Sequence, residues 1–167
     1  MKVIITDHHK LPEKLPEAVA IINPCGELWY DKSRSFCGAG VAYKLVEAME
    51  NADEYLDFAI LGTIGDSMPL IGQSRVIVKK GLKSIADSNI LGIKTIFNKL
   101  NLNCNPVDAI DLAFKLIPRI NASGRMKSAD IALKLLTSNS IEECSEICDC
   151  LDNLNAKRKQ TEEEILL

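Results

Sequence analysis

The sequence predicts an α/β chain that begins with two parallel strands and continues as helices almost to its end. Two runs of strand-forming residues lie close together, at residues 3–6 and 18–22. Both runs are continuously apolar, which is typical of parallel strands covered on both faces. From residue 39 onward the apolar residues recur at helical spacing. Two strands do not form an independent sheet, so we expect the remaining strands to lie outside this sequence.

Turn-forming residues separate the predicted elements. Pro16 and the pair Asn23-Pro24 bound the second strand, and a polar loop follows over residues 25–38. A second loop is predicted at 102–106, and Pro118 should break any helix near Leu116. Helices are predicted over residues 39–50, 53–65, 73–88, 91–101 and 128–139, and a last helix opens at Ser140.

The last helix is predicted from its start signal and from its periodicity. Ser140 and Glu143 have the spacing of a capping box. The apolar stripe of this helix consists of Ile141, Cys144, Ile147, Leu151 and Leu154. We expect two domains, a partial α/β domain over residues 1–90 and a helical connecting region over residues 91–167.

Composition excludes several classes of protein. The net charge of −3 argues against a basic nucleic-acid coat, although a local basic patch remains open. There is no apolar run of about 18 residues for a membrane span, and the apolar start is too short for a signal peptide, so we expect a cytoplasmic protein. The six cysteines are then expected to be reduced; the alternative is a metal cluster of Cys144, Cys148 and Cys150, whose spacing matches no zinc motif.

Ionisable residues gather at the end of the first strand and after the second predicted helix. Asp7, His8 and His9 follow residues 3–6 directly, and ligands bind at the carboxyl ends of strands in open α/β sheets. Asp66 follows the apolar segment LDFAILGTIG, where it could reach a metal beside His8. The alternatives are a polar surface loop for the first group and an ordinary turn aspartate for Asp66.

A third candidate site is the segment PRINASGRM, which we expect to be an irregular turn. It contains Arg119, Asn121, Ser123, Gly124 and Arg125, and Lys115 and Lys127 flank it. Guanidinium groups pair with two phosphate oxygens at once, so the segment suits a nucleic-acid backbone. An ordinary solvated loop is the alternative.

Five blocks occur in one order and together resemble the DHH phosphoesterase superfamily, in particular its single-stranded-DNA-specific exonucleases. The blocks are VIITDHHKLPEKLPEAVAIINP, CGAGVAYKL, LDFAILGTIGDSMPLIGQSRVIVKKGL, FKLIPRINASGRM and LDNLNAKRKQ. The DHH triplet alone is weak, whereas the PRINASGRM block points to the exonucleases. The resemblance covers nearly the whole chain.

The resemblance implies a metal-dependent 5′ to 3′ exonuclease that hydrolyses DNA in repair and recombination, with one or two Mn²⁺ (or Mg²⁺) ions. It implies that His8 and Asp66 bind metal, that Asp7 supports the site and that His9 faces the scissile phosphate. It also implies that the residues of the third candidate site contact single-stranded DNA: Arg119, Asn121, Ser123, Gly124 and Arg125. Other DNA-repair proteins are expected partners, and a membrane is not.

The sequence also departs from the family pattern. Only six residues precede Asp7, so the upstream aspartate motifs are missing, as is the later glycine-rich motif of the DHHA1 domain. We therefore expect an internal segment with weak or no activity by itself and with an exposed sheet edge that promotes self-association. The alternatives are a phosphodiesterase for short oligonucleotides or cyclic dinucleotides, and a truncated, non-catalytic chain that binds nucleic acid.

Overall fold

The fold is described from a computed structural model, which describes residues 1–26, 35–102 and 107–166. The chain divides into two compact units, Met1–Gly81 and Leu82–Leu167. Each unit is considered by itself below. The predicted loops at 25–38 and 102–106 lie largely outside the described residues.

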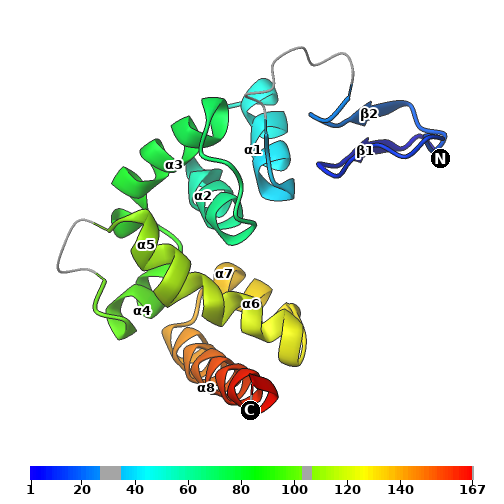
Figure 1. The fold of residues 1–167 in the computed structure, drawn as a ribbon. Helices are drawn as coiled ribbons and strands as arrows, with labels where there is room; N and C mark the ends of the chain where they lie inside the picture. The colour runs from blue at the N-terminus through cyan, green and yellow to red at the C-terminus, as the bar shows by residue number, and fades with distance from the viewer. Residues whose placement is uncertain (27–34, 103–106, 167) are drawn as a thin grey trace. The chain divides into compact units, whose positions relative to one another are not determined.

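The first unit opens with the predicted pair of parallel strands, β1 (Ile4–Thr6) and β2 (Ala20–Ile22). Ile4 pairs with Ala20 and Thr6 with Ile22, and the two strands lie side by side in Figure 1. The mixed α/β class and the parallel pairing are therefore confirmed. The expected cover on both faces is absent among the described residues, since Ile4 and Val19 are 61% and 64% exposed.

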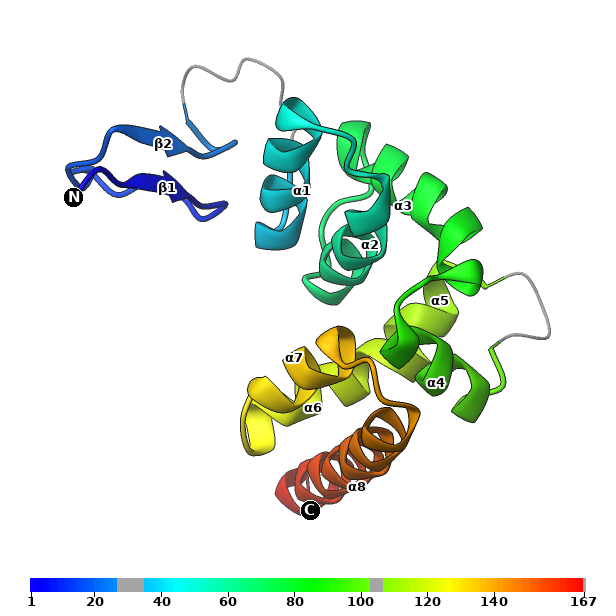
Figure 2. The ribbon, with the colours of Figure 1, turned by 180° about the vertical axis from the view of Figure 1, so that it is seen from behind.

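Among its described residues the first unit also contains the helices α1 (Gly38–Met49), α2 (Leu56–Gly65) and α3 (Gly72–Ser84), and the last residues of α3 belong to the second unit. A short 3₁₀ turn, η1 (Asp53–Tyr55), leads into α2. Helices α1 and α2 pack against each other, as both views show (Figures 1 and 2). The core of this unit is formed by Phe36, Val41, Tyr43, Ala52, Leu56, Ala59 and Ile77.

The regular elements of the second unit are all helices among its described residues, and short turns join them. Helix α8 (Ile141–Leu166) packs against α4 (Leu91–Lys99), α6 (Ile117–Met126) and α7 (Asp130–Thr137). Shorter pieces precede them: the turn η2 (Ile85–Asp87), the helix α5 (Ala109–Asp111) and the π-helical segment η3 (Leu112–Leu116). None of the described helices combines the length and the apolarity that crossing a membrane requires.

The prediction that Pro118 breaks the chain into an irregular turn is wrong. Residues 117–126 form α6, with Pro118 in its first turn. Proline lacks an N–H and its ring crowds the carbonyl four residues earlier, which an ordinary helix interior does not tolerate. Here the preceding turn is the π-helical η3, and the wider turn relieves that conflict. The segment PRINASGRM is therefore presented on a helix.

The start of α8 confirms half of the predicted capping box. The Ser140 hydroxyl accepts from the backbone N–H of Glu143 at 3.2 Å, while the N–H of Ser140 donates to the Ser138 hydroxyl at 3.1 Å. The predicted stripe is wrong at Ile141, which is 64% exposed. Ile141 precedes the first buried residue of the helix, Cys144, and Cys148, which the predicted stripe omits, also belongs to the buried face.

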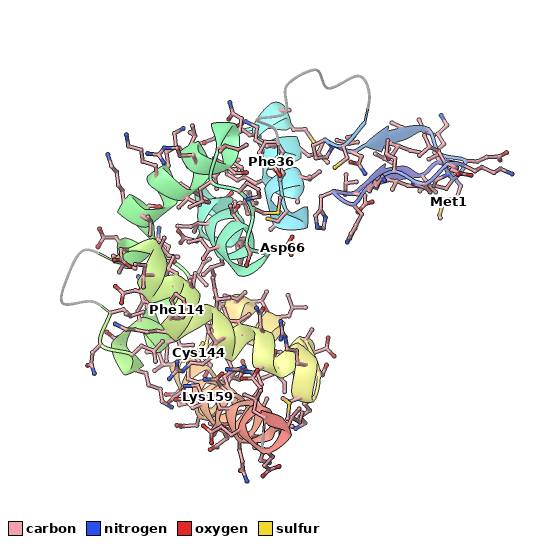
Figure 3. The ribbon with its side chains drawn as sticks, viewed as in Figure 1. Met1, Phe36, Asp66, Phe114, Cys144 and Lys159 are labelled. Carbon is pink, nitrogen blue, oxygen red and sulfur yellow. The ribbon has the colours of Figure 1, made fainter. Side chains whose placement is uncertain are left out.

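The cysteines of α8 form no metal cluster among the described residues. Cys144 and Cys148 are buried in the helix packing (Cys144 is labelled in Figure 3). Burial raises the pKa of the Cys148 thiol to about 11. A protonated thiol is neither a metal ligand nor a nucleophile, so this cysteine has a packing role.

Candidate metal centre

Asp7, His8 and His9 follow β1 immediately, at its carboxyl end. The backbone N–H of Asp7 donates to the carbonyl of Ile22 at 3.0 Å, so the strand pairing extends to this residue. The side chains of Asp7, His8 and His9 each offer a ligand atom, and these atoms all lie within 4.8 Å of one another. The predicted gathering of ionisable groups at this strand end is therefore present in the fold.

Asp7 and His9 form a hydrogen-bonded pair. His9 Nδ1 lies 2.8 Å from Asp7 Oδ1. This bond, together with the backbone N–H groups of His8 and His9, holds the pKa of the Asp7 carboxyl below its ordinary value. An ionised carboxylate only accepts hydrogen bonds, so Nδ1 of His9 carries the proton and Nε2 is left free. The His9 side chain is 75% exposed, which leaves this ring open to solvent.

Asp66, which is labelled in Figure 3, follows the last residue of α2. A complete helix-capping motif holds it there. The N–H of Ser67 donates to Ile64 O, and the N–H of Met68 donates to Thr63 O, both at 3.1 Å. These are the two bonds of a Schellman motif, and Ser67 takes the left-handed conformation (φ 53°) that this motif requires. The backbone of Asp66 is thereby fixed at the point where α2 ends.

His8 and Asp66 meet although they come from distant parts of the sequence. His8 Nε2 lies 3.2 Å from Asp66 Oδ2. The first residue of α1 also adjoins this ring: a Cβ on Gly38 would lie 3.5 Å from His8 Nδ1. The first unit therefore brings together all four residues predicted to form the metal and catalytic site.

The donor set fits a hard divalent cation. Imidazole nitrogen and carboxylate oxygen suit Mn²⁺, and carboxylate oxygen suits Mg²⁺. Two ligands at right angles around an ion with bonds of about 2.1 Å lie about 3 Å apart, which is close to the separation of His8 Nε2 and Asp66 Oδ2. Asp66 also caps the carboxyl end of α2, where the helix dipole is negative and favours a cation.

Asn23 is a residue of this site that the sequence interpretation used only as a strand boundary. Its side chain is 3% exposed, and its amide donates to the carbonyl of His9 at 2.9 Å. The available signal was its position: an asparagine directly after β2 lies at the same sheet edge as Asp7.

The predicted nucleic-acid contacts lie on α6, in the second unit, and their side chains differ in availability. Arg125 and Gly124 are exposed and Asn121 is half-buried. Arg119 Nε donates to Asp152 Oδ1 at 2.5 Å, and a second nitrogen donates to the carbonyl of Lys115, so this guanidinium is engaged within the fold. Ser123 is fully buried and its hydroxyl donates to Ile120 O at 2.8 Å.

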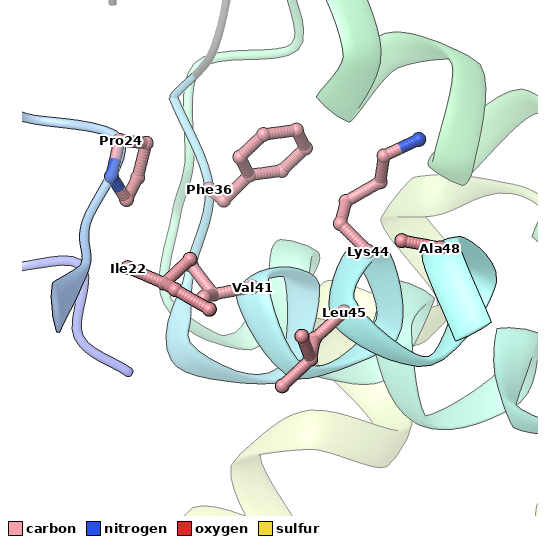
Figure 4. A pocket seen from close by; sticks show the side chains of 7 residues that line it. All are labelled: Ile22, Pro24, Phe36, Val41, Lys44, Leu45 and Ala48. Carbon is pink, nitrogen blue, oxygen red and sulfur yellow. The ribbon is translucent and has the colours of Figure 1, made fainter. Parts of the chain in front are cut away.

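The first unit also contains an apolar cavity of about 290 Å³ beside α1 (Figure 4). Its lining is made of Ile22, Pro24, Phe36, Val41, Lys44, Leu45 and Ala48. The amine of Lys44 pairs with Glu47. None of the predicted site residues lines this cavity, so it is separate from the candidate metal centre.

The strand pair and the DHH triplet at its edge lie in the part of the chain that matches a known family. Residues 1–63 match the model of the DHH family, N-terminal domain. This part of the chain is thus similar to DHH-family proteins, which confirms the resemblance inferred from the sequence.

The similarity extends over almost the whole chain to RecJ, the single-stranded-DNA-specific exonuclease. RecJ of Bacillus subtilis is 37% identical over an alignment of 162 residues that covers 96% of this chain and 21% of that protein. RecJ of Thermus thermophilus is 36% identical over an alignment of 172 residues that covers 99% of this chain and 25% of that protein. The chain thus spans well under half of the relatives it matches.

Solved RecJ structures have the same fold. A crystal structure of RecJ from Thermus thermophilus in complex with Mn²⁺ matches with a TM-score of 0.87 at 34% identity, over 99% of this chain and 26% of that one. A crystal structure of the same protein in complex with Mg²⁺ matches with a TM-score of 0.81 over 98% of this chain and 25% of that one. Both metals are among those that the donor set predicts.

Proposed function

We propose that this chain supplies part of the catalytic centre of a metal-dependent exonuclease that hydrolyses single-stranded DNA from a 5′ end. The observation that carries the proposal is the 3.2 Å contact between His8 Nε2 and Asp66 Oδ2 at the strand edge. The similar RecJ proteins are single-stranded-DNA-specific exonucleases by name, which supports the substrate class. A role in DNA repair and recombination in the cytoplasm, alongside other repair proteins, belongs to the same proposal.

The contacts of each side chain at the candidate metal centre indicate its role in the reaction. His8 and Asp66 bind the divalent ion, and Asp7 orients His9 through the Nδ1 bond. His9 faces the scissile phosphate, with Nε2 free to accept or deliver a proton. When bound, a divalent cation supplies an activated water molecule and stabilises charge on the phosphodiester oxygens.

Helix α6 provides the contacts to the DNA backbone. Arg125 and Asn121 present their side chains to solvent or to its edge, and the exposed Gly124 allows close approach of a strand. Arg119 and Ser123 support these residues from within the fold, since both side chains are already bonded there. Such contacts bind phosphates without reading sequence.

We also propose that the 167-residue chain has weak or no nuclease activity by itself. At the described centre the chain offers two imidazoles and two carboxylates, and His9 is engaged with Asp7. A two-metal site needs more ligands and more negative charge than His8, Asp66 and Asp7 provide. The complete site then draws further ligands from additional sequence.

The test is degradation of a long 5′-phosphorylated single strand with Mn²⁺, by the chain and by its Asp66→Ala variant. No degradation by either protein is expected for the isolated chain. The same substitution placed in a full-length protein containing this segment should abolish activity. Full activity of the Asp66→Ala full-length protein would contradict the proposed metal site, and preferential cleavage of a dinucleotide over the long strand would favour the small-substrate alternative.

A further inference from the structure

We propose that Asn23 is a positioning residue that fixes Asp7 and His9 in their catalytic arrangement. The use of Asp7 and His9 in catalysis rests on the proposed function, whereas the positioning itself does not. The side chain of Asn23 joins the end of β2 to the loop that follows β1, and every contact described below lies within the first unit.

The amide of Asn23 is bonded on both of its ends. Its Oδ1 accepts from the backbone N–H of Cys25 at 2.8 Å. Its Nδ2 donates to the carbonyl of His9 at 2.9 Å and lies 3.5 Å from Asp7 Oδ2. Because Cys25 supplies a donor and His9 an acceptor, only one orientation of the amide satisfies both.

Burial makes these bonds obligatory. The residue is 3% exposed, so an unpaired amide group would pay its full desolvation cost there. The two Nδ2 hydrogens therefore hold the His9 backbone and face the Asp7 carboxylate. A second bond from the same loop, from Cys25 Sγ to the carbonyl of His8 at 3.4 Å, ties the neighbouring residue to the same turn.

As a consequence, the two carboxylate oxygens of Asp7 contact different residues. Oδ2 faces the amide of Asn23, and Oδ1 is left to bind His9 Nδ1 at 2.8 Å. With the His9 backbone held by the same amide, the ring meets Oδ1 in one geometry and in one tautomer. A neutral donor is required, since a carboxylate at position 23 would repel that of Asp7.

Histidine NMR tests this directly, because His8 and His9 are the only two histidines of the chain. The ring nitrogens of the metal-free, full chain are observed at a pH where both rings are neutral. Asn23→Asp is the decisive variant: it keeps an oxygen for the N–H of Cys25 and removes both donors. Asn51→Ala is the matched control, since Asn51 Oδ1 accepts from the N–H of Asp53 at 3.2 Å in a turn of the same kind away from the site.

We expect the native chain and the Asn51→Ala variant to show His9 protonated at Nδ1, and the Asn23→Asp variant to show a mixture of tautomers with backbone amide signals elsewhere unchanged. Asn23→Ala should behave like Asn23→Asp. A native-like His9 in Asn23→Asp would show that Asn23 only holds its turn, and the proposal would fail. The proposal would also fail if the native His9 were not protonated at Nδ1.

Titration with Mn²⁺ separates this inference from the proposed function. Broadening of the His8 and His9 signals reports ion binding, and we expect the apparent affinity of the Asn23→Ala variant, which adds no charge near the ion, to be about 10- to 100-fold lower, as for other residues that orient metal ligands. If Mn²⁺ broadens the signals of neither ring in the native chain, the proposal that this chain binds metal is contradicted. The tautomer of His9 in the native chain and in the Asn23 variants would still test the positioning role of Asn23.

Discussion

Replacement of Gly62 by alanine is predicted to destabilise the first unit and to loosen the candidate metal centre together. Gly62 lies where α2 crosses the start of α1, and a Cβ there would be 2.6 Å from Ala39 Cβ and 3.2 Å from Cys37 Sγ. Carbon atoms in contact normally stay about 3.5–4.0 Å apart, so the two helices must separate by about 1 Å.

The expected loss of stability follows from two opposing effects. Overpacking of this kind costs about 1–3 kcal/mol, whereas alanine stabilises a helix by about 1 kcal/mol relative to glycine. The net effect is a destabilisation of up to about 2 kcal/mol relative to the native chain. The site should respond as well, because the N–H of Asp66 donates to the carbonyl of Gly62 at 2.9 Å and moves with it.

Urea denaturation measures the stability, and the ring signals of His8 measure the site. Gly124→Ala serves as the control, because its Cβ would meet Ala129 Cβ at an ordinary 3.7 Å and should stabilise α6. The double variant Gly62→Ala/Ala39→Gly removes the clash and should recover part of the loss. A Gly62→Ala protein as stable as Gly124→Ala, with unchanged His8 signals, would refute the reasoning.

Four further outcomes are expected. Ser67→Gly should raise the free energy of unfolding by about 1 kcal/mol, since Ser67 has a positive φ of 53° that glycine adopts without strain; thermal unfolding checks this. Burial raises the pKa of Asp152, but bonds to Arg119 and Lys99 outweigh this effect and lower the pKa below 3.8. Asp152→Asn should therefore cost about 1 kcal/mol at pH 7, and this difference should shrink as the pH falls below 3.8 and vanish below the lowered pKa, as urea denaturation at several pH values would show. Iodoacetamide at pH 8 should label the exposed Cys25 well before Cys148, whose pKa is about 11, as peptide mass spectrometry would show; equal labelling would contradict the packing of α8. Val19→Lys should reduce concentration-dependent association through the exposed strands, as measured by light scattering, and an unchanged molecular mass would argue against edge pairing.

Local patterns predicted most elements of this fold. The apolar runs before Asp7 and Asn23 predicted the two strands, and continuous rather than alternating runs predicted their parallel pairing. The burial of both faces of the strand pair could not be predicted correctly from these runs, because it depends on which other elements pack against the two strands. Ile4 and Val19 are apolar and exposed in this chain, which composition alone does not reveal.

The failures at Pro118 and Ile141 have a common physical origin. Rules for single residues treat a proline as a helix breaker and an apolar residue as buried, whereas tertiary context overrides both. A π-helical turn accommodates Pro118, and Ile141 precedes Cys144, the first buried residue of α8.

The candidate site shows the same limit. DHH and Asp66 could be identified from their positions after a strand and after a helix, and the fold brings them together. The role of Asn23 could not be predicted, because it depends on an amide that reaches across the sheet edge to His9. Likewise, the engagement of Arg119 with Asp152 depends on the packing of α6 against α8.

Helix α8 packs against its neighbouring helices along only part of its length. Its buried residues end at Asn155, and the following turns to Leu166 are almost wholly exposed, held straight by pairs such as Arg158 with Glu162. Eleven helical residues extend for about 16 Å. The packed part includes Asp152, which pairs with Arg119 on α6. The helix that carries Arg125 is therefore supported by the packed part of α8 and not by its exposed end.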